Sequence, residues 1–372
     1  MKDGEMETRI FKGARKSGSG WGGPLLTTER RRDQSLTGEE ALLVEKRIVP
    51  TSCRASAAFR RAIVFLLLVC LAGLPSCRSQ PPPEASLRVL CTFLPMWAFT
   101  RNVVGERSGI EVSVLIPGHQ GPHDYHLTPG DLRKISAADL LVANGYGLEE
   151  FIVVSARTAN PGLRILEAGT AAEPIHVDRD GRWVMGGAHR EGGHHHDHHG
   201  INPHPFASPR EAAKMVRRIG EELAAIDPEG AAEYRRNAEA YAGRLEALAD
   251  EFREVAASSP NPRVITHHNA FDYLARDSGL VIVAVIETVP GQAPSAGELN
   301  RLAEKARSEG VVAVFSEPQF SDRLARVLSE EAGIRVESLD PAATGEMRPD
   351  YYETVMRKNL ETLRRVLSAG ND

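Results

Sequence analysis

Cysteine is scarce in this chain of 372 residues, and the four cysteines all lie in its first quarter, at positions 53, 70, 77 and 91. None of them belongs to a Cys-x-x-Cys pair, so their spacing excludes the usual thiolate zinc sites. The remaining three quarters of the chain hold no cysteine, which also excludes a disulfide framework. Any metal chemistry of this chain must therefore use other side chains.

A surplus of positive charge is also missing. The chain has 45 Lys and Arg against 50 Asp and Glu, which gives a formal net charge of −5. Without a basic stripe, nucleic acid is excluded as an expected partner. The hydrophobic share of 42% and the charged share of 26% are typical of a globular protein. An acidic surplus suits a protein that meets cations.

Long hydrophobic runs are missing as well. The main apolar stretch, residues 62–74, is shorter than the roughly 20 residues that a membrane-spanning helix needs. It follows Arg60-Arg61 and ends at Leu-Pro-Ser-Cys77, so residues 60–77 are predicted to be a lipoprotein-type signal peptide with Cys77 as the lipidated residue.

The signal peptide divides the chain before the folded part begins. Residues 1–59 precede it, and we interpret this N-terminal extension as a mis-assigned start, with a genuine cytoplasmic extension as the alternative. Residues 78–85 are rich in proline and predict a stiff tether. Both segments are left out of the fold prediction.

From residue 86 onward, short apolar runs alternate with amphipathic stretches, which is typical of an α/β architecture with parallel strands. Four strands are expected in each half, over residues 87–91, 112–116, 139–143, 163–166, 264–266, 281–286, 311–315 and 334–338. The sequence thus predicts two lobes, 86–227 and 261–372, each with a four-stranded parallel sheet flanked by helices.

The stretch between the two sets of strands has a purely helical pattern. Ser208, followed by proline and an early acidic residue, is expected to cap a first helix. Beyond it, apolar residues recur at helical spacing, and no proline interrupts them after position 228. Residues 228–257 are therefore predicted to form one long helix that joins the lobes.

Histidine, in contrast, is plentiful, with 13 in the chain. Because parallel strands open their carboxyl ends onto one crevice, the loops of His123, His268 and Asp340 can face one cleft, with His204 beside it. Three imidazoles and one carboxylate suit a divalent cation such as Zn²⁺ in tetrahedral geometry. His267 precedes His268, and neighbours along a strand point opposite ways, so only one of the two should face the metal.

A second concentration of histidine lies between glycines in residues 189–200. Several exchangeable imidazoles near one another predict an auxiliary loop that collects metal, with incidental metal binding as the alternative. The residues expected to take part are His189, His194, His195, His196, Asp197, His198 and His199.

Several segments resemble, in the same order, the zinc- and manganese-binding lipoproteins of bacterial ABC importers. These segments are Pro122-His-Asp-Tyr, Ala138–Glu149, Asn202-Pro-His-Pro, His268-Asn-Ala-Phe and Leu339-Asp-Pro. The resemblance implies two lobes joined by one rigid helix, with metal bound between them. It assigns His123, His204 and His268 as ligands, with Asp340 as the fourth, or water or another carboxylate in its place.

The resemblance also implies a function. A monomeric, lipid-anchored protein on the periplasmic or extracellular face of the membrane would capture Zn²⁺ and deliver it to an ABC permease and its ATPase. Histidine at position 268, where manganese-type members commonly have glutamate, favours Zn²⁺ over Mn²⁺.

Three alternatives compete with a zinc importer. They are a manganese-type binding protein, a metal-dependent adhesin or metal buffer, and a zinc hydrolase. A hydrolase needs a general base beside a metal-bound water, a role open to Glu317 or Glu287. The sequence has no His-Glu-x-x-His pair, however, so we expect a binding protein and not an enzyme.

Overall fold

The computed structural model describes residues 87–177, 200–288 and 291–368. In this part of the chain two four-stranded parallel sheets form, as the sequence predicts. The first has the order β2-β1-β3-β4 and contains β1 (Leu87–Cys91), β2 (Ile110–Val114), β3 (Leu140–Ala143) and β4 (Arg164–Glu167). The second has the order β10-β9-β7-β8 and contains β7 (Arg263–Thr266), β8 (Val281–Val285), β9 (Ala313–Ser316) and β10 (Arg335–Ser338).

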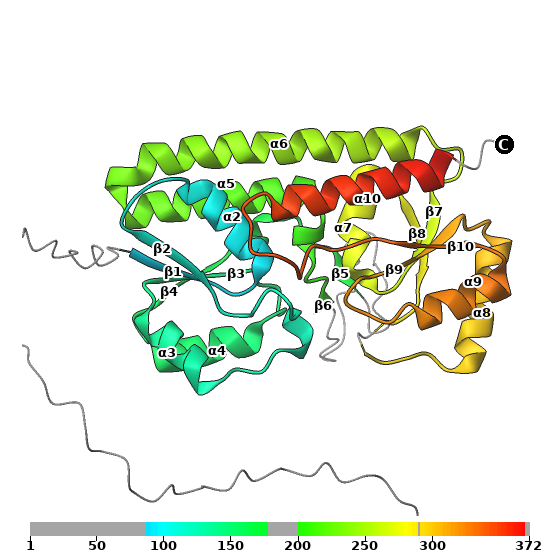
Figure 1. Cartoon of the computed structure of the whole chain (residues 1–372), viewed down its shortest axis with the longest axis horizontal. Helices are drawn as coiled ribbons and strands as arrows, with labels where there is room; N and C mark the ends of the chain where they lie inside the picture. The colour runs from blue at the N-terminus through cyan, green and yellow to red at the C-terminus, as the bar shows by residue number, and fades with distance from the viewer. Residues whose placement is uncertain (1–86, 178–199, 289–290, 369–372) are drawn as a thin grey trace, which may run out of the picture. The chain divides into compact units, whose positions relative to one another are not determined.

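Helices cover these sheets and complete two lobes (Figure 1). The N-terminal lobe adds α2 (Leu94–Val104), α3 (Pro129–Ala137) and α4 (Glu150–Ala159), and the C-terminal lobe adds α7 (Asp272–Ser278), α8 (Ala296–Ser308) and α9 (Arg323–Ala332). Central strands such as β3 and β9 are buried along their whole length. This burial explains why they appear in the sequence as continuous apolar runs and not as alternating ones.

Three long helices connect the lobes: α5 (Pro209–Ile226), α6 (Ala231–Ala257) and α10 (Tyr351–Ser368). Helix α6 runs past both lobes in Figure 1. The predicted joining helix is thus confirmed, with the short 3-10 turn η4 (Pro228–Gly230) ahead of its first turn. Its predicted apolar face is buried through Tyr234, Tyr241, Leu245, Leu248 and Phe252.

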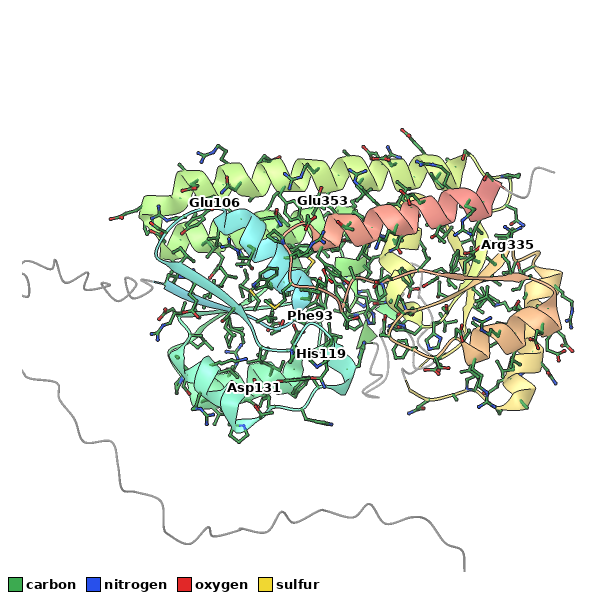
Figure 2. The ribbon with its side chains drawn as sticks, in the orientation of Figure 1. Phe93, Glu106, His119, Asp131, Arg335 and Glu353 are labelled. Atoms are coloured by element: carbon green, nitrogen blue, oxygen red, sulfur yellow. The ribbon has the colours of Figure 1, made fainter. Side chains whose placement is uncertain are left out.

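Buried packing, more than surface charge, holds these three helices together. Arg217 of α5 pairs with Glu239 and Glu246 of α6. Arg244 of α6 pairs with Glu353 of α10, and Figure 2 labels Glu353 on that helix. Exposed pairs of this kind contribute only about 0–1 kcal/mol each. The main apolar core, in contrast, runs without a break from Leu87 in the N-terminal lobe to Leu367 at the end of α10. The lobes therefore share one core along these helices.

Ser208 differs from the sequence prediction. It is the residue before the first turn of α5, but its side chain makes no capping hydrogen bond there. Its hydroxyl instead donates to Oδ2 of Asp277 in α7, at 2.5 Å. The capping prediction was wrong because a carboxylate from the other lobe offers a stronger, charged acceptor.

A short antiparallel pair, β5 (His176–Val177) and β6 (Gly200–Ile201), was not foreseen from the sequence. It pairs Val177 with Gly200 and so brings together the two ends of the segment 178–199. That segment lies outside the described residues, and the predicted auxiliary loop falls within it except for its last residue, Gly200.

The predicted extension, signal peptide and tether also lie outside the described residues, and Cys77 with them. Within the ranges that are described, no helix is long and apolar enough to cross a membrane.

Candidate metal centre

Each of the three predicted histidine ligands stands at or beside a 3-10 turn that interrupts the chain between regular elements. His123 lies in η1 (Pro122–Asp124), which follows β2. His204 directly precedes η3 (Pro205–Ala207), and His268 directly precedes η5 (Asn269–Phe271) after β7. These turns direct side chains from three separate segments toward the space between the lobes.

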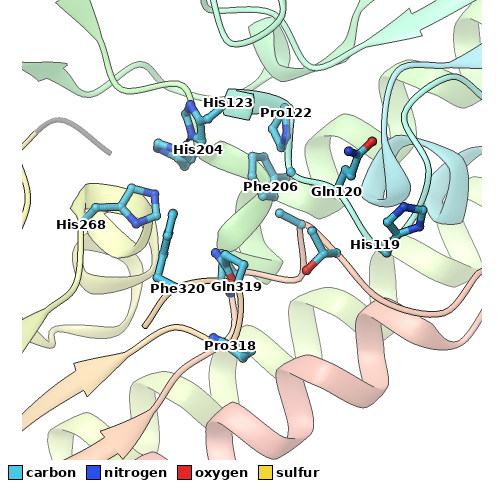
Figure 3. A pocket seen from close by; sticks show the side chains of 14 residues that line it. His119, Gln120, Pro122, His123, His204, Phe206, His268, Pro318, Gln319 and Phe320 are labelled. Atoms are coloured by element: carbon cyan, nitrogen blue, oxygen red, sulfur yellow. Dashed lines mark hydrogen bonds between the residues drawn. The ribbon is translucent and has the colours of Figure 1, made fainter. Parts of the chain in front are cut away.

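The three imidazole rings converge on one point (Figure 3). One ligand atom from each of His123, His204 and His268 lies within 4.8 Å of the others. The Nε2 atoms of His123 and His204 are 3.1 Å apart. Two nitrogens bound to one Zn²⁺ at about 2.0–2.1 Å in tetrahedral geometry would be about 3.3–3.4 Å apart, so the observed spacing is close to that of a bound pair.

The ring of His204 is fixed by Asn202. Its Nδ1 lies 2.9 Å from Oδ1 of Asn202, which also accepts the backbone N–H of His204 at 3.0 Å. An amide oxygen can only accept, so Nδ1 carries the proton and Nε2 presents its lone pair. Burial, and then the nearby rings of His268 and His123, hold the pKa of His204 well below its usual value. The ring is therefore neutral, as a metal ligand must be.

The ring of His268 is fixed in the same way by Glu317. Its Nδ1 lies 2.5 Å from Oε1 of Glu317, and Gln319 donates to the other carboxylate oxygen at 2.7 Å. Both His268 and Glu317 are almost completely buried. Nothing in the described part of the chain hydrogen-bonds to Nε2 of His268. A buried polar atom without a partner is rare in proteins, and a metal ion would satisfy this one.

His267 is not part of the group. Its ring stacks on Phe320 with centroids 4.7 Å apart and planes 16° apart. Its Nε2 lies 3.7 Å from Oε2 of Glu287, and burial lowers its pKa. The structure therefore brings one of the two adjacent histidines, His268, to the other ligand candidates.

Asp340, the expected fourth ligand, stands outside the group that the structure brings together. Its Oδ1 accepts the backbone N–H of Ala342 at 2.8 Å, so the carboxylate turns back onto its own loop. Burial, with a smaller contribution from Glu317, raises the pKa of Asp340 to about 6. Among the described residues, the group that could hold a metal ion thus consists of three histidines and does not include Asp340.

Sequence reasoning missed the roles of Asn202 and Glu317. Histidines that bind metals usually donate their other ring N–H to a carboxylate or carbonyl group. The sequence offered a signal for each partner, since Asn202 stands two positions before His204 and Glu317 directly follows a buried strand. Neither signal shows by itself which histidine the side chain of Asn202 or Glu317 contacts.

A cavity of about 350 Å³ opens beside the three rings and is lined by both lobes. Phe206, Gln319 and Phe320 line it near the histidines, whereas His119 lies at its far end (Figure 3). The cavity borders all three rings, of which only that of His123 is exposed.

Comparison with known proteins identifies relatives that cover most of the chain. The chain is 30% identical over 313 residues to the zinc-binding lipoprotein AdcA of Streptococcus pneumoniae, covering 82% of this chain and 60% of that protein. It is also 30% identical over 323 residues to the high-affinity zinc uptake system protein ZnuA of Bacillus subtilis, covering 83% and 96%. The chain thus spans about 60% of the length of AdcA and nearly all of ZnuA.

Solved structures agree with this likeness. The substrate-binding protein FpvC of Pseudomonas aeruginosa, in complex with Ni²⁺, superposes with a TM-score of 0.66 at 30% identity, over 77% of this chain and 98% of that one. The same protein has also been solved with Mn²⁺.

The model of one protein family matches residues 89–366, a range that contains all three converging histidines and both sheets except the first two residues of β1. The family is described as the periplasmic component A of zinc-uptake complexes. Its members are binding proteins, which confirms the expectation of a non-enzymatic protein and removes the hydrolase alternative. The chain therefore belongs to the family of periplasmic zinc-uptake components.

Proposed function

We propose that this protein captures one Zn²⁺ ion between its lobes and delivers it to the permease of an ABC importer. The ligands are Nε2 of His123, His204 and His268. The convergence of their ligand atoms within 4.8 Å carries the proposal. In two of the rings, those of His204 and His268, Nδ1 is directed at a protein acceptor. The orientation of the opposite nitrogen, Nε2, is therefore fixed before an ion binds.

Zinc suits this ligand set better than manganese does. Three imidazole nitrogens without a carboxylate favour a borderline ion, whereas Mn²⁺ prefers oxygen ligands. Ni²⁺ and Cu²⁺ also bind imidazole strongly, and the related FpvC has been solved with Ni²⁺. Zn²⁺ accepts tetrahedral geometry without cost, and three rings plus one water from the cavity provide it. We therefore place water, and not Asp340, in the fourth position.

Delivery to a permease and attachment to the membrane extend the same proposal. The family is described as a component of zinc-uptake complexes, and the relative AdcA is named a lipoprotein. An anchor at Cys77 on the periplasmic or extracellular face would keep the protein close to an ABC permease and its ATPase.

Metal analysis and competitive titration of the purified protein test the proposal. We expect one tight Zn²⁺ site per chain and weaker binding of Mn²⁺ at the same site. Tighter binding of Mn²⁺ than of Zn²⁺, or a tight site that survives loss of all three histidines, would contradict it. Cells without the protein should take up less zinc when zinc is scarce.

The low pKa of His204 predicts how many protons zinc displaces. A ring whose pKa lies well below 6.5 is already neutral at pH 6, so it has no proton to release when the ion binds. Three imidazoles with the ordinary pKa of about 6.5 would together release roughly 2.3 protons at pH 6, so we expect clearly fewer protons than this per Zn²⁺. Calorimetry in buffers with different ionisation enthalpies measures this number, and a release as large as that of three ordinary imidazoles would contradict the assignment.

Deleting residues 189–199 should separate metal collection from tight binding. The deletion removes the predicted auxiliary histidines but keeps both strands of the β5–β6 pair. We expect one tight Zn²⁺ site to remain and additional weaker sites to disappear, because separate imidazoles lose conformational entropy when they converge on one ion. Calorimetric stoichiometry of the parent and the deletion variant checks this. Loss of the tight site would show that the segment supplies one of its ligands.

A further inference from the structure

Helix α7 connects the two halves of the candidate metal centre. It begins four positions after His268, yet its polar side chains bind the part of the chain around His204. The hydrogen-bonded pairs are Asp272 with Asn202, Tyr273 with Asn202, Arg276 with Glu211, and Asp277 with Ser208. A short C-terminal-lobe helix thus contacts the segment that carries an N-terminal-lobe ligand.

Asn202 lies at the centre of these contacts and is completely buried. Its Oδ1 accepts the ring Nδ1–H and the backbone N–H of His204. Its Nδ2 donates to Oδ2 of Asp272 at 2.9 Å and to the backbone oxygen of Asn269 at 2.7 Å. Its backbone groups bind Ile175 and the Tyr273 hydroxyl.

These bonds link two ligands that come from different lobes. Asn269 directly follows His268, so Nδ2 of Asn202 binds the chain immediately beyond one ligand while Oδ1 binds the ring of another. A planar amide cannot rotate to serve one partner without leaving the other. The orientation of the His204 ring is therefore set by atoms that move together with His268.

We infer that Asn202 is a positioning residue that holds His204 in register with His268, with Asp272 of α7 fixing Asn202 from the C-terminal lobe. This inference rests on the proposed zinc site. Its consequence is that the integrity of the contact between lobes contributes to zinc affinity, because ligands that are already oriented lose less freedom when the ion binds. A purely local role, in which Asn202 orients His204 without help from α7, is the competing explanation.

Two aspartates of α7 form a matched pair that separates these explanations. Asp272 is 7% exposed and binds Asn202. The side chain of Asp277 is 8% exposed and binds Ser208. In the described hydrogen bonds, Ser208 contacts none of the three histidines. Both substitutions to alanine remove a carboxylate and one polar contact between lobes, and Asp277→Ala also removes an ion pair with Arg276 of the same helix. Only Asp272→Ala interrupts the path to His204.

The test measures zinc affinity by chelator competition, and the unfolding free energy of the metal-free protein by denaturant titration. We expect Asp272→Ala to weaken zinc binding about tenfold, at the lower end of the usual 10–100-fold for supporting residues, and Asp277→Ala to change it by less than about twofold. Because Asp277→Ala also breaks the ion pair with Arg276, it should lose at least as much stability as Asp272→Ala, so a loss of zinc affinity confined to Asp272→Ala would not be a stability effect. Asp272→Asn keeps an oxygen that can accept from Asn202 and should restore most of the affinity.

A second measurement does not depend on zinc. In the metal-free parent, nuclear magnetic resonance should show a ring Nδ1–H of His204 that exchanges slowly with solvent, and Asp272→Ala should speed this exchange whereas Asp277→Ala should not. Equal zinc affinities in both variants and the parent, with unchanged ring-proton exchange, would overturn the inference. Absence of tight zinc binding in the parent would overturn the proposed function, and the ring-proton exchange would still decide the role of Asn202.

Discussion

Replacement of His268 by alanine should weaken Zn²⁺ binding by about 100- to 1000-fold, whereas replacement of its neighbour His267 should change it only slightly. Structural zinc sites with four ligands bind with about 10–16 kcal/mol, so one ligand accounts for about 2.5–4 kcal/mol. His268 directs an unpartnered Nε2 at the other two rings. His267 stacks on Phe320 instead and is not a member of the group.

The two variants control for each other because the residues are adjacent, equally buried and chemically identical. Competition with a zinc chelator at pH 7.5 gives both affinities, and circular dichroism shows whether each variant folds. His123→Ala and His204→Ala should behave like His268→Ala. Equal losses at positions 267 and 268 would show that general burial of imidazole, and not coordination, explains the effect.

The sequence predicted the sheets well because their strands are buried on both faces. Apolar runs as short as the one over β3 are typical of buried parallel strands, and turn residues mark where they end. The two strands β5 and β6 escaped prediction because each has only two residues, too few for a periodic pattern. Ile175, the residue before β5, donates its backbone N–H to the hydroxyl of Tyr273 in α7, a contact that is remote in sequence.

The histidine group could be predicted because parallel strands and the loops beside them place side chains at one edge regardless of packing details. The direction of a single side chain within a loop is decided more locally. Asp340 follows a strand as expected, but its carboxylate accepts a hydrogen bond from the backbone two residues on, a bond that short acidic side chains readily form. Ser208 shows the opposite case, in which a remote carboxylate overrides a local cap.

The pairing of Glu317 with His268 could not be deduced from the sequence either, because it requires knowing that β9 lies next to β7. The two residues are 49 positions apart, and the order β9-β7-β8 sets Glu317 on one side of β7 and Glu287 on the other. The chain thus presents two buried histidine–glutamate pairs side by side. Only the pair with Glu317 includes a member of the three-histidine group, His268.

The two histidine–glutamate pairs allow a matched comparison of their glutamates. Glu317→Gln should weaken Zn²⁺ binding about tenfold or more, because a carboxylate that accepts the Nδ1–H of a histidine strengthens the opposite nitrogen as a ligand and fixes the ring. Glu287→Gln should have much less effect. Its carboxylate accepts the backbone N–H of Gly291 at 2.8 Å, a role that an amide oxygen can also fill, and its histidine neighbour does not join the group.

Both substitutions remove one formal negative charge from the same end of the same sheet, so a general electrostatic effect on a divalent ion would act in both variants. The difference between their zinc affinities therefore isolates the hydrogen bond to His268. A visible spectrum of bound Co²⁺ adds a geometric measurement, because the positions and strengths of its bands respond to ligand orientation. We expect the spectrum to change in Glu317→Gln and to stay as in the parent in Glu287→Gln. Equal affinity losses in the two variants would mean that charge alone, and not the orientation of His268, connects Glu317 to the metal.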